Sequence, residues 1–354
     1  MTILNNYGWN TFHLKNSQQD PETELVIGRV ISIKGFKYFL ITESGEKETE
    51  LSGKLLFGAT PEELPKVGDW VFYLDYGTLG YIISVFPRMN ELSRKDPGTK
   101  FQKQVIAANI DYAFIVQGLD ADFNLMRMER YIVQIIACGI KPIALLNKAD
   151  IVDNVDEYKQ HVDKLQRGIP VHCCSTYSGL GISELLKDVM ETGRTYILIG
   201  SSGTGKSSLM NSFMNFDLQK IGIKSDSTGK GKHTTTSRDL FVLPNGSLII
   251  DTPGMREFGM TSDEGQSSSE LFPVIAKIAE GCRYTDCMHI NEVGCAVLDS
   301  LNNGTLETEI YDSYLKLMKE QRRFGIKVED KKRLNKQFGK MTKEAKNYRK
   351  KYKY

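Results

Sequence analysis

A glycine-rich segment at residues 200–207 has the residue types and spacing that bind phosphate. It reads Gly200-Ser201-Ser202-Gly203-Thr204-Gly205-Lys206-Ser207, fits GxxxxGK[ST] in full and follows the apolar run YILI. Glycines let backbone N–H groups converge on a phosphate at a helix N-terminus, where the helix dipole favours anions. Lys206 can reach the β- and γ-phosphate oxygens of a nucleoside triphosphate, and the Ser207 hydroxyl can ligate Mg²⁺. With Ser208, these residues form the predicted phosphate-binding loop, and Lys206 is a catalytic candidate.

Two later segments carry groups that could respond to the γ-phosphate. Asp251-Thr252-Pro253-Gly254 follows the apolar run SLII, so we expect Asp251 to hold Mg²⁺ and Gly254 to offer its backbone N–H to the γ-phosphate. The polar stretch GKGKHTTT lies between this segment and the loop, at residues 229–236. We expect Thr235 to act in catalysis by completing the magnesium shell of Ser207 and Asp251. In the alternative, the stretch is a flexible loop whose threonines have no role.

Met255 follows the DTPG segment, where small GTPases commonly place a glutamine that orients the attacking water. A thioether cannot orient water in this way. We therefore predict slow intrinsic hydrolysis that a partner accelerates, with His233 as a candidate for positioning the water. His233 as a plain loop histidine is the alternative.

Base specificity is predicted from Asn147-Lys148-Ala149-Asp150, at the end of the apolar run PIALL. The Asp150 carboxylate can accept hydrogen bonds from guanine N1–H and the exocyclic amine, whereas adenine would leave it unpaired. The Lys148 stem can lie over the base. A last base-contacting loop is expected near residues 173–179, CCSTYSG, which matches the usual Ser-Ala pattern only loosely. A plain loop with two buried thiols is the alternative.

The order of these motifs is unusual. In familiar small GTPases the phosphate loop comes first and the NKxD segment comes late. In this chain NKAD at 147–150 precedes the phosphate loop at 200 and DTPG at 251. Joining the old termini and opening the fold after DxxG produces this order without changing the sheet, because chain termini commonly lie close together at the surface. The sequence therefore predicts a circularly permuted GTPase.

Three cysteines and a histidine form a separate cluster near the C-terminal end. Cys282, Cys287, His289 and Cys295 fall within 14 residues and supply the ligand set of a closed structural Zn²⁺ site. The spacing offers no open position for catalysis, and a bound metal would replace a core in a segment too short to build one. Free cysteines in a reduced compartment are the alternative.

Composition is that of a globular cytoplasmic protein, with 40% hydrophobic and 25% charged residues. The N-terminus has no signal-peptide pattern, and we expect no membrane segment. The net charge of +2 conceals a basic tail: residues 320–354 hold 14 Lys and Arg against four Asp and Glu. Such a tail suits the phosphate backbone of a nucleic acid, although a solvated helix would have the same composition.

The elements that must position these residues are predicted in three parts. Residues 1–88 hold an N-terminal segment and five short strands, which suit an oligonucleotide-binding β-barrel or another small barrel. Residues 89–108 are polar and basic and are predicted to be a linker or mobile loop. Residues 109–260 alternate strands and helices, which predicts a parallel sheet covered by helices. Residues 261–354 are predicted to be a zinc-binding helical domain with the basic tail.

With these features together, the chain resembles the RsgA family of bacterial small-ribosomal-subunit assembly GTPases over roughly residues 25–325. GSSGTGKSS, GKGKHTTT, DTPGMREFG, NKAD and the zinc spacing carry the resemblance. It implies an oligonucleotide-binding barrel, a permuted GTPase domain and a helical domain with one structural zinc. It also implies GTP hydrolysis with Mg²⁺, stimulated by the small subunit late in its maturation, with rRNA as a partner. We expect a monomer.

Two other function classes are open at this point. One is a P-loop kinase or ATPase that acts on a small molecule, which base preference at Asp150 would distinguish. The other is a nucleic-acid-binding scaffold with a vestigial nucleotide site. The complete set of Lys206, Ser207 and Asp251 argues against the scaffold, because a site without turnover has little need of it.

Overall fold

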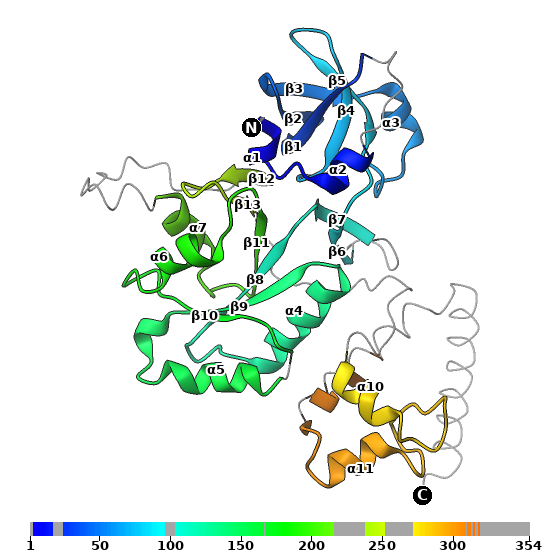
Figure 1. The fold of residues 1–354 in the computed structure, drawn as a ribbon, viewed down its shortest axis with the longest axis vertical. Helices are drawn as coiled ribbons and strands as arrows, with labels where there is room; N and C mark the ends of the chain where they lie inside the picture. Colours follow the sequence, from blue (N-terminus) through cyan, green and yellow to red (C-terminus); the bar gives the residue numbers. More distant parts are fainter. Residues whose placement is uncertain are drawn as a thin grey trace, which may run out of the picture. The chain divides into compact units, whose positions relative to one another are not determined.

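The computed structural model describes residues 3–16, 24–95, 103–165, 167–215, 238–251 and 272–308, with 310–312, 314, 315 and 318. The chain divides into two compact units, Met1–Thr261 and Ser262–Tyr354. The first contains a β-barrel and a sheet flanked by helices, and the second is helical (Figure 1). Among the described residues, no helix is both long enough and apolar enough to cross a bilayer.

The first five strands close into a barrel. Their order is β1-β2-β3-β5-β4, and β4 pairs again with β1. All neighbours are antiparallel except β3 and β5. This is the topology of the five-stranded oligonucleotide-binding barrel, so the predicted barrel is confirmed. Its elements are β1 (Val26–Lys34), β2 (Lys37–Thr42), β3 (Gly45–Leu51), α3 (Gly53–Gly58), β4 (Trp70–Asp75) and β5 (Gly80–Val85).

Two short N-terminal helices, α1 (Ile3–Asn6) and α2 (Thr11–Asn16), precede the barrel. Leu4 packs with the fully buried Trp70 of β4, and Trp9 meets the Trp70 ring edge to face at 4.8 Å between centroids. The N-terminal segment thus fills an aromatic cluster on the barrel.

Arg29 of β1 joins this cluster, the barrel and the sheet that follows. Its guanidinium is fully buried and donates to the carbonyls of Gly68 (3.1 Å), Tyr7 (2.5 Å) and Asn109 (3.1 Å) and to the Thr195 hydroxyl (3.0 Å). Burial lowers the pKa of Arg29 to about 10, so the group stays charged at neutral pH. One cation therefore ties together four chain segments that are distant in sequence.

Residues 89–108, predicted to be a linker or mobile loop, contain two paired strands. These are β6 (Glu91–Lys95) and β7 (Lys103–Ala108), which pair antiparallel. Leu92 and Ile106 are buried. The polar composition of the segment concealed these inward-facing apolar positions, which is why the sequence suggested a loop.

The second part of this unit is a sheet of order β10-β9-β8-β11-β13-β12, in which only β12 runs antiparallel. This matches the predicted β-α alternation. The strands are β8 (Tyr112–Gly118), β9 (Lys141–Asn147), β10 (Val171–Cys173), β11 (Thr195–Ile199), β12 (Asp239–Val242) and β13 (Leu248–Asp251). The helices are α4 (Leu125–Ala137), α5 (Val155–Asp163), α6 (Ile182–Glu184) with the π-helical turn η2 (Leu185–Val189), and α7 (Lys206–Met214).

Helices cover both faces of this sheet (Figure 1). On β8, Ala113 and Ile115 belong to one buried cluster, which includes residues of α4 and α5. Phe114 and Val116, on the opposite face, belong to a second cluster, which includes residues of α6, η2 and α7. Because successive strand residues point to opposite faces, a strand buried on both sides is continuously apolar, as β8 is from Tyr112 to Val116.

Among the described residues, one strand-to-strand pair extends the β-ladder from the barrel into the sheet. Ser32 of β1 pairs with Asp239 of β12, and its hydroxyl donates to the Asp239 carboxylate. Asp239 in turn stands opposite Asp251 of β13. The described parts of the barrel and the sheet therefore form one structural body.

In the second unit, α10 (Pro273–Ala279) and α11 (Ala296–Asn302) pack together. The loop between them carries the cysteines and the histidine singled out from the sequence. The basic tail at residues 320–354 lies outside the described residues.

Candidate nucleotide site and metal centre

The phosphate-loop motif connects the buried strand β11 to α7, as predicted. A Cβ atom at Gly205 would lie 2.2 Å from Nδ2 of Asn147, and one at Gly200 would lie 2.3 Å from the Val116 carbonyl oxygen. Gly205 also has a φ of +92°, which disfavours residues with a side chain. Glycine is thus required at these positions by close approach of the loop to neighbouring strand ends.

Lys206 lies at the start of α7, with its ammonium group directed back into the loop. Nζ donates to the carbonyl oxygens of Gly200 (2.7 Å) and Ser201 (2.6 Å). Burial lowers the pKa of Lys206. The Thr204 hydroxyl donates to the same Ser201 carbonyl at 3.1 Å. The loop is therefore folded around the cation, while Ser207 and Ser208 are exposed in the first turn of α7.

Asn147 links the base-specificity segment to the phosphate loop. It ends β9, is only 1% exposed, and its Nδ2 donates to the Thr204 carbonyl at 2.9 Å. The Cys174 thiol donates to Oδ1 of Asn147 at 3.6 Å. Burial raises the pKa of Cys174 to about 12, which keeps it a thiol and therefore a donor. Two motifs that are 57 residues apart thus meet at one edge of the sheet.

Asp150 lies in the 3₁₀ turn η1 (Ala149–Ile151), and its carboxylate accepts a hydrogen bond from the buried Ser175 hydroxyl. Ser175 Oγ in turn accepts the backbone N–H groups of Tyr177 and Ser178, each at 3.1 Å. The serine orientation is therefore fixed from three directions. This arrangement directs one carboxylate oxygen of Asp150 toward Ser175.

Lys148, between these two residues, has a left-handed backbone conformation with φ of +63°. Its ammonium group pairs with Asp120, at 2.5 Å between Nζ and Oδ2. Asp120 follows β8, the strand next to β9. The side chains of Asn147, Lys148 and Asp150 are thus held by residues from three other loops, those after β8, β10 and β11.

Asp251 ends β13, next to β11, so it lies at the same carboxyl edge of the sheet as the phosphate loop. In open α/β sheets this edge is where ligands bind. The other predicted nucleotide-responsive residues, Thr235, His233 and Gly254, lie outside the described residues.

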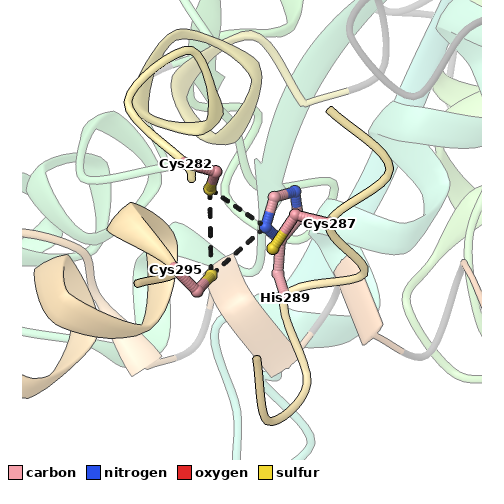
Figure 2. A group of neighbouring side chains, drawn as sticks. All are labelled: Cys282, Cys287, His289 and Cys295. Atoms are coloured by element: carbon pink, nitrogen blue, oxygen red, sulfur yellow. Dashed lines mark hydrogen bonds between the residues drawn. The ribbon is translucent and has the colours of Figure 1, made fainter. Parts of the chain in front are cut away.

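The four predicted zinc ligands converge in the second unit (Figure 2). Nδ1 of His289 lies 3.4 Å from Sγ of Cys295 and 3.6 Å from Sγ of Cys282, and these two sulfurs are 3.9 Å apart. With Cys287, all four donor atoms lie within 4.8 Å of one another. A tetrahedral zinc site has edges of about 3.5–3.8 Å between such donors. The cluster can therefore hold a zinc ion.

Backbone features around the cluster fix its donors. His289 has a φ of +57°, and its carbonyl accepts the Tyr311 hydroxyl at 2.6 Å. The Glu292 carboxylate accepts the N–H groups of Met288, Ile290 and Asn291 at 2.8–3.0 Å, and these bonds, chiefly that from Ile290, lower the pKa of Glu292 to about 2. Loop turns, more than side-chain packing, thus place the ligands.

Comparison with known proteins agrees with this geometry. Residues 85–261 match the family model for the RsgA GTPase. The "Small ribosomal subunit biogenesis GTPase RsgA 1" of Bacteroides thetaiotaomicron is 38% identical over 344 residues, covering 97% of this chain and 96% of that protein. This chain belongs to the RsgA family. It is therefore a GTPase that hydrolyses GTP. RsgA 2 of Vibrio parahaemolyticus is 37% identical, with 96% and 91% of the two chains covered.

Two solved structures share the fold of this RsgA-family chain. YjeQ from Thermotoga maritima superposes with a TM-score of 0.63 at 24% identity, over 86% of this chain and all of the other. YloQ, described as a circularly permuted GTPase, superposes with a TM-score of 0.61 at 23% identity, over 88% of this chain and all of the other. The predicted permuted fold is confirmed.

Two residues of this RsgA site were not singled out from the sequence, although one of them, Ser175, lies in the loop at residues 173–179 that was expected to contact the base. The loose CCSTYSG match drew attention to the cysteines, whereas it is Ser175 that contacts Asp150. The available signal for Ser175 was its place just after a predicted strand. That strand was expected to run parallel to the strand that carries NKAD. Asp120 had a weaker signal, as one of two acidic residues after the apolar run of β8.

Proposed function

We propose that this chain is an assembly factor for the small (30S) ribosomal subunit. It binds the rRNA late in maturation and leaves when the subunit stimulates GTP hydrolysis. The observation that carries the proposal is the Asn147–Thr204 hydrogen bond of 2.9 Å. It brings the proposed guanine-binding segment into contact with the phosphate-binding loop. Relatives that match nearly the whole chain are named small ribosomal subunit biogenesis GTPases, which supports the same partner here.

The nucleotide would lie along the carboxyl edge of the sheet, with its base at Asp150 and its phosphates at residues 200–208. The Asp150 oxygen that does not face Ser175 is available to guanine N1–H and the exocyclic amine. Lys148 would cover the purine with its methylene stem. Lys206 would exchange its two loop carbonyls for β- and γ-phosphate oxygens, which are stronger acceptors because they are charged.

Ser207, Thr235 and Asp251 would hold Mg²⁺, which neutralises charge that develops on the phosphate oxygens. Gly254 would donate its N–H to the γ-phosphate. His233 would position the attacking water, because Met255 cannot. Slow intrinsic turnover that the subunit accelerates follows from this division of roles.

RNA contacts are assigned to three parts of the chain: the barrel in residues 1–88, the zinc-binding domain that begins at residue 261, and the basic tail. The GTPase domain spans residues 109–260 between them. We propose a cytoplasmic monomer with one structural zinc ion. Because the segment after Asp251 leads directly into the zinc-binding domain, loss of the γ-phosphate can change how that domain is held.

The test compares GTP hydrolysis with isolated small subunits, with isolated large subunits and without addition. We expect small subunits alone to raise turnover about 100-fold or more, the scale at which positioned groups act on a hydrolytic step. Lys206→Ala serves as the control without a functional phosphate loop and should show no stimulation.

Either alternative class predicts a different result. A P-loop kinase or ATPase would consume ATP as readily as GTP and ignore both subunits. A nucleic-acid-binding scaffold would bind small subunits while turnover stayed near zero. Stimulation by large subunits would overturn the partner assignment.

A further inference from the structure

The loop that follows β8 lies directly against the base-specificity segment. The Leu119 N–H donates to the Asn147 carbonyl at 2.9 Å, which joins the two backbones. One residue later, Asp120 forms its ion pair with Lys148. Asp120 is therefore positioned by a backbone contact to the same segment whose side chain it binds.

The Asp120 carboxylate is itself held in place within this loop. Oδ1 accepts the Asp122 N–H at 3.2 Å, and the Asp120 carbonyl accepts the Phe123 N–H at 2.9 Å. The side chain of Gln117 donates to the Asp122 carbonyl at 3.1 Å, which fixes the far side of the turn. The hydrogen bond from Lys148 is the main cause that lowers the pKa of Asp120, so the carboxylate is charged at neutral pH.

Lys148 has little freedom at either end of its side chain. Its backbone is left-handed, and a Cβ atom at Gly118 would lie 3.4 Å from Lys148 Cδ and 3.2 Å from Asp120 Oδ1. The methylene stem thus runs beside a glycine that leaves room for the pair. Both partners are about one-third exposed, and ion pairs at such exposure add little to stability. The geometry therefore indicates that the ion pair with Asp120 orients the methylene stem of Lys148 more than it stabilises the fold.

We propose that Asp120 is a positioning residue for guanine recognition, which holds the Lys148 stem in the place where it covers the purine. The inference rests on the proposed contact between Lys148 and the base. A long flexible side chain that is anchored before binding loses less rotamer freedom when the nucleotide arrives. The gain in affinity comes from the contact with the base, which GTP and GDP share, so it is equal for the two nucleotides. It does not alter the choice of guanine over xanthine, which Asp150 makes.

The experiment substitutes Asp120→Asn, which keeps an acceptor for the Asp122 N–H and removes the charge. Equilibrium binding of fluorescent GDP and GTP analogues should weaken about three- to tenfold for both nucleotides. The hydrolysis rate at saturating GTP should stay within about twofold of the starting protein. Asp120→Glu, which retains the charge, should recover part of the lost affinity.

Asp122→Asn is the matched control, because Asp122 lies in the same loop as Asp120 but pairs with Arg127 of α4 and not with Lys148. It should leave nucleotide affinity unchanged. Lys148→Met keeps a stem and removes the ammonium group, so adding Asp120→Asn to it should cause no further loss. Additive losses in the double variant, an equal loss in Asp122→Asn, or unchanged affinity in Asp120→Asn would each overturn the inference.

Lys148→Ala separates failure of this inference from failure of the proposed function. If Lys148→Ala weakens guanine nucleotide binding and Asp120→Asn does not, Lys148 contacts the base without the help of Asp120. If Lys148→Ala has no effect, the proposed base contact itself is wrong, and the inference is overturned with it.

Discussion

At the scale of single residues, the proposed selectivity for guanine depends on where the Asp150 carboxylate is held. Asp150 projects from a 3₁₀ turn, and a buried serine hydroxyl binds one of its oxygens. A carboxylate without such a contact would rotate and be hydrated. Ser175 removes that freedom before any ligand arrives, which is a form of preorganisation.

Asp150→Asn should exchange the base preference of the enzyme. An amide offers a donor where guanine presents N1–H, so guanine affinity should fall about 100-fold or more, while xanthine, which has a carbonyl in place of the amine, should gain. Binding and turnover with GTP and XTP measure the change. Asp153→Asn, an exposed aspartate three residues later, is the control. Retained GTP preference in Asp150→Asn would remove this carboxylate from base recognition.

At the scale of elements, apolar runs predicted the buried strands well. Within residues 109–260 the apolar runs at 111–117, 140–146 and 195–199 predict strands, and the structure places these strands at 112–118, 141–147 and 195–199. ETELSGKLLF, one of the five short strands predicted in residues 1–88, is not a single strand, since β3 ends at Leu51 and α3 begins at Gly53. Ser52-Gly53 interrupts the run there, and because glycine is depleted in strand interiors, this pair was an available signal for the end of the strand.

We expect the order of the loop between α10 and α11, which carries the cysteines and His289, to depend on a bound zinc ion. Removing zinc with a chelator, or substituting Cys295→Ser, should release one zinc ion per chain and abolish the helical signal of the second unit, because metal binding and folding are coupled in small sites. Metal analysis and circular dichroism report the two effects. Nucleotide affinity of the first unit should change less than about twofold.

Cys138→Ser is the control for the zinc experiment. Cys138 caps the C-terminal end of α4 in the first unit and does not belong to the zinc cluster. It should retain the full metal content. A protein that keeps its zinc after Cys295→Ser would contradict the four-ligand site.

At the scale of the whole molecule, motif spacing predicted which segments meet, but not which residues hold them together. NKAD, the phosphate loop and the zinc ligands have patterns of their own. Ser175, Asp120 and Arg29 have none, because their roles depend on partners 25, 28 and up to 166 residues away. Contacts over such separations become visible only when the sheet order is known.

Arg29→Met tests how the first unit is held together. The variant takes the Arg29 donors away from three carbonyls and a hydroxyl, of which the Gly68 carbonyl keeps a second donor in Nδ2 of Asn109, so the free energy of unfolding should fall by about 3–5 kcal/mol. Thermal unfolding should shift down by roughly 6–15 °C for a unit of this size. Lys37→Met, which breaks an exposed pair with Glu48, should shift it far less. Equal shifts would contradict a central role for Arg29.

The burial of Arg29 also separates two kinds of electrostatics in this protein. Mobile ions screen charges at a solvated surface within about 10 Å at 0.1 M salt, but they do not enter a dry interior. The guanidinium and its acceptors on Gly68, Asn109 and Thr195 lie in such an interior, and the Tyr7 carbonyl belongs to a half-buried residue. Ionic strength that screens charges at the surface therefore leaves the barrel seated on the sheet.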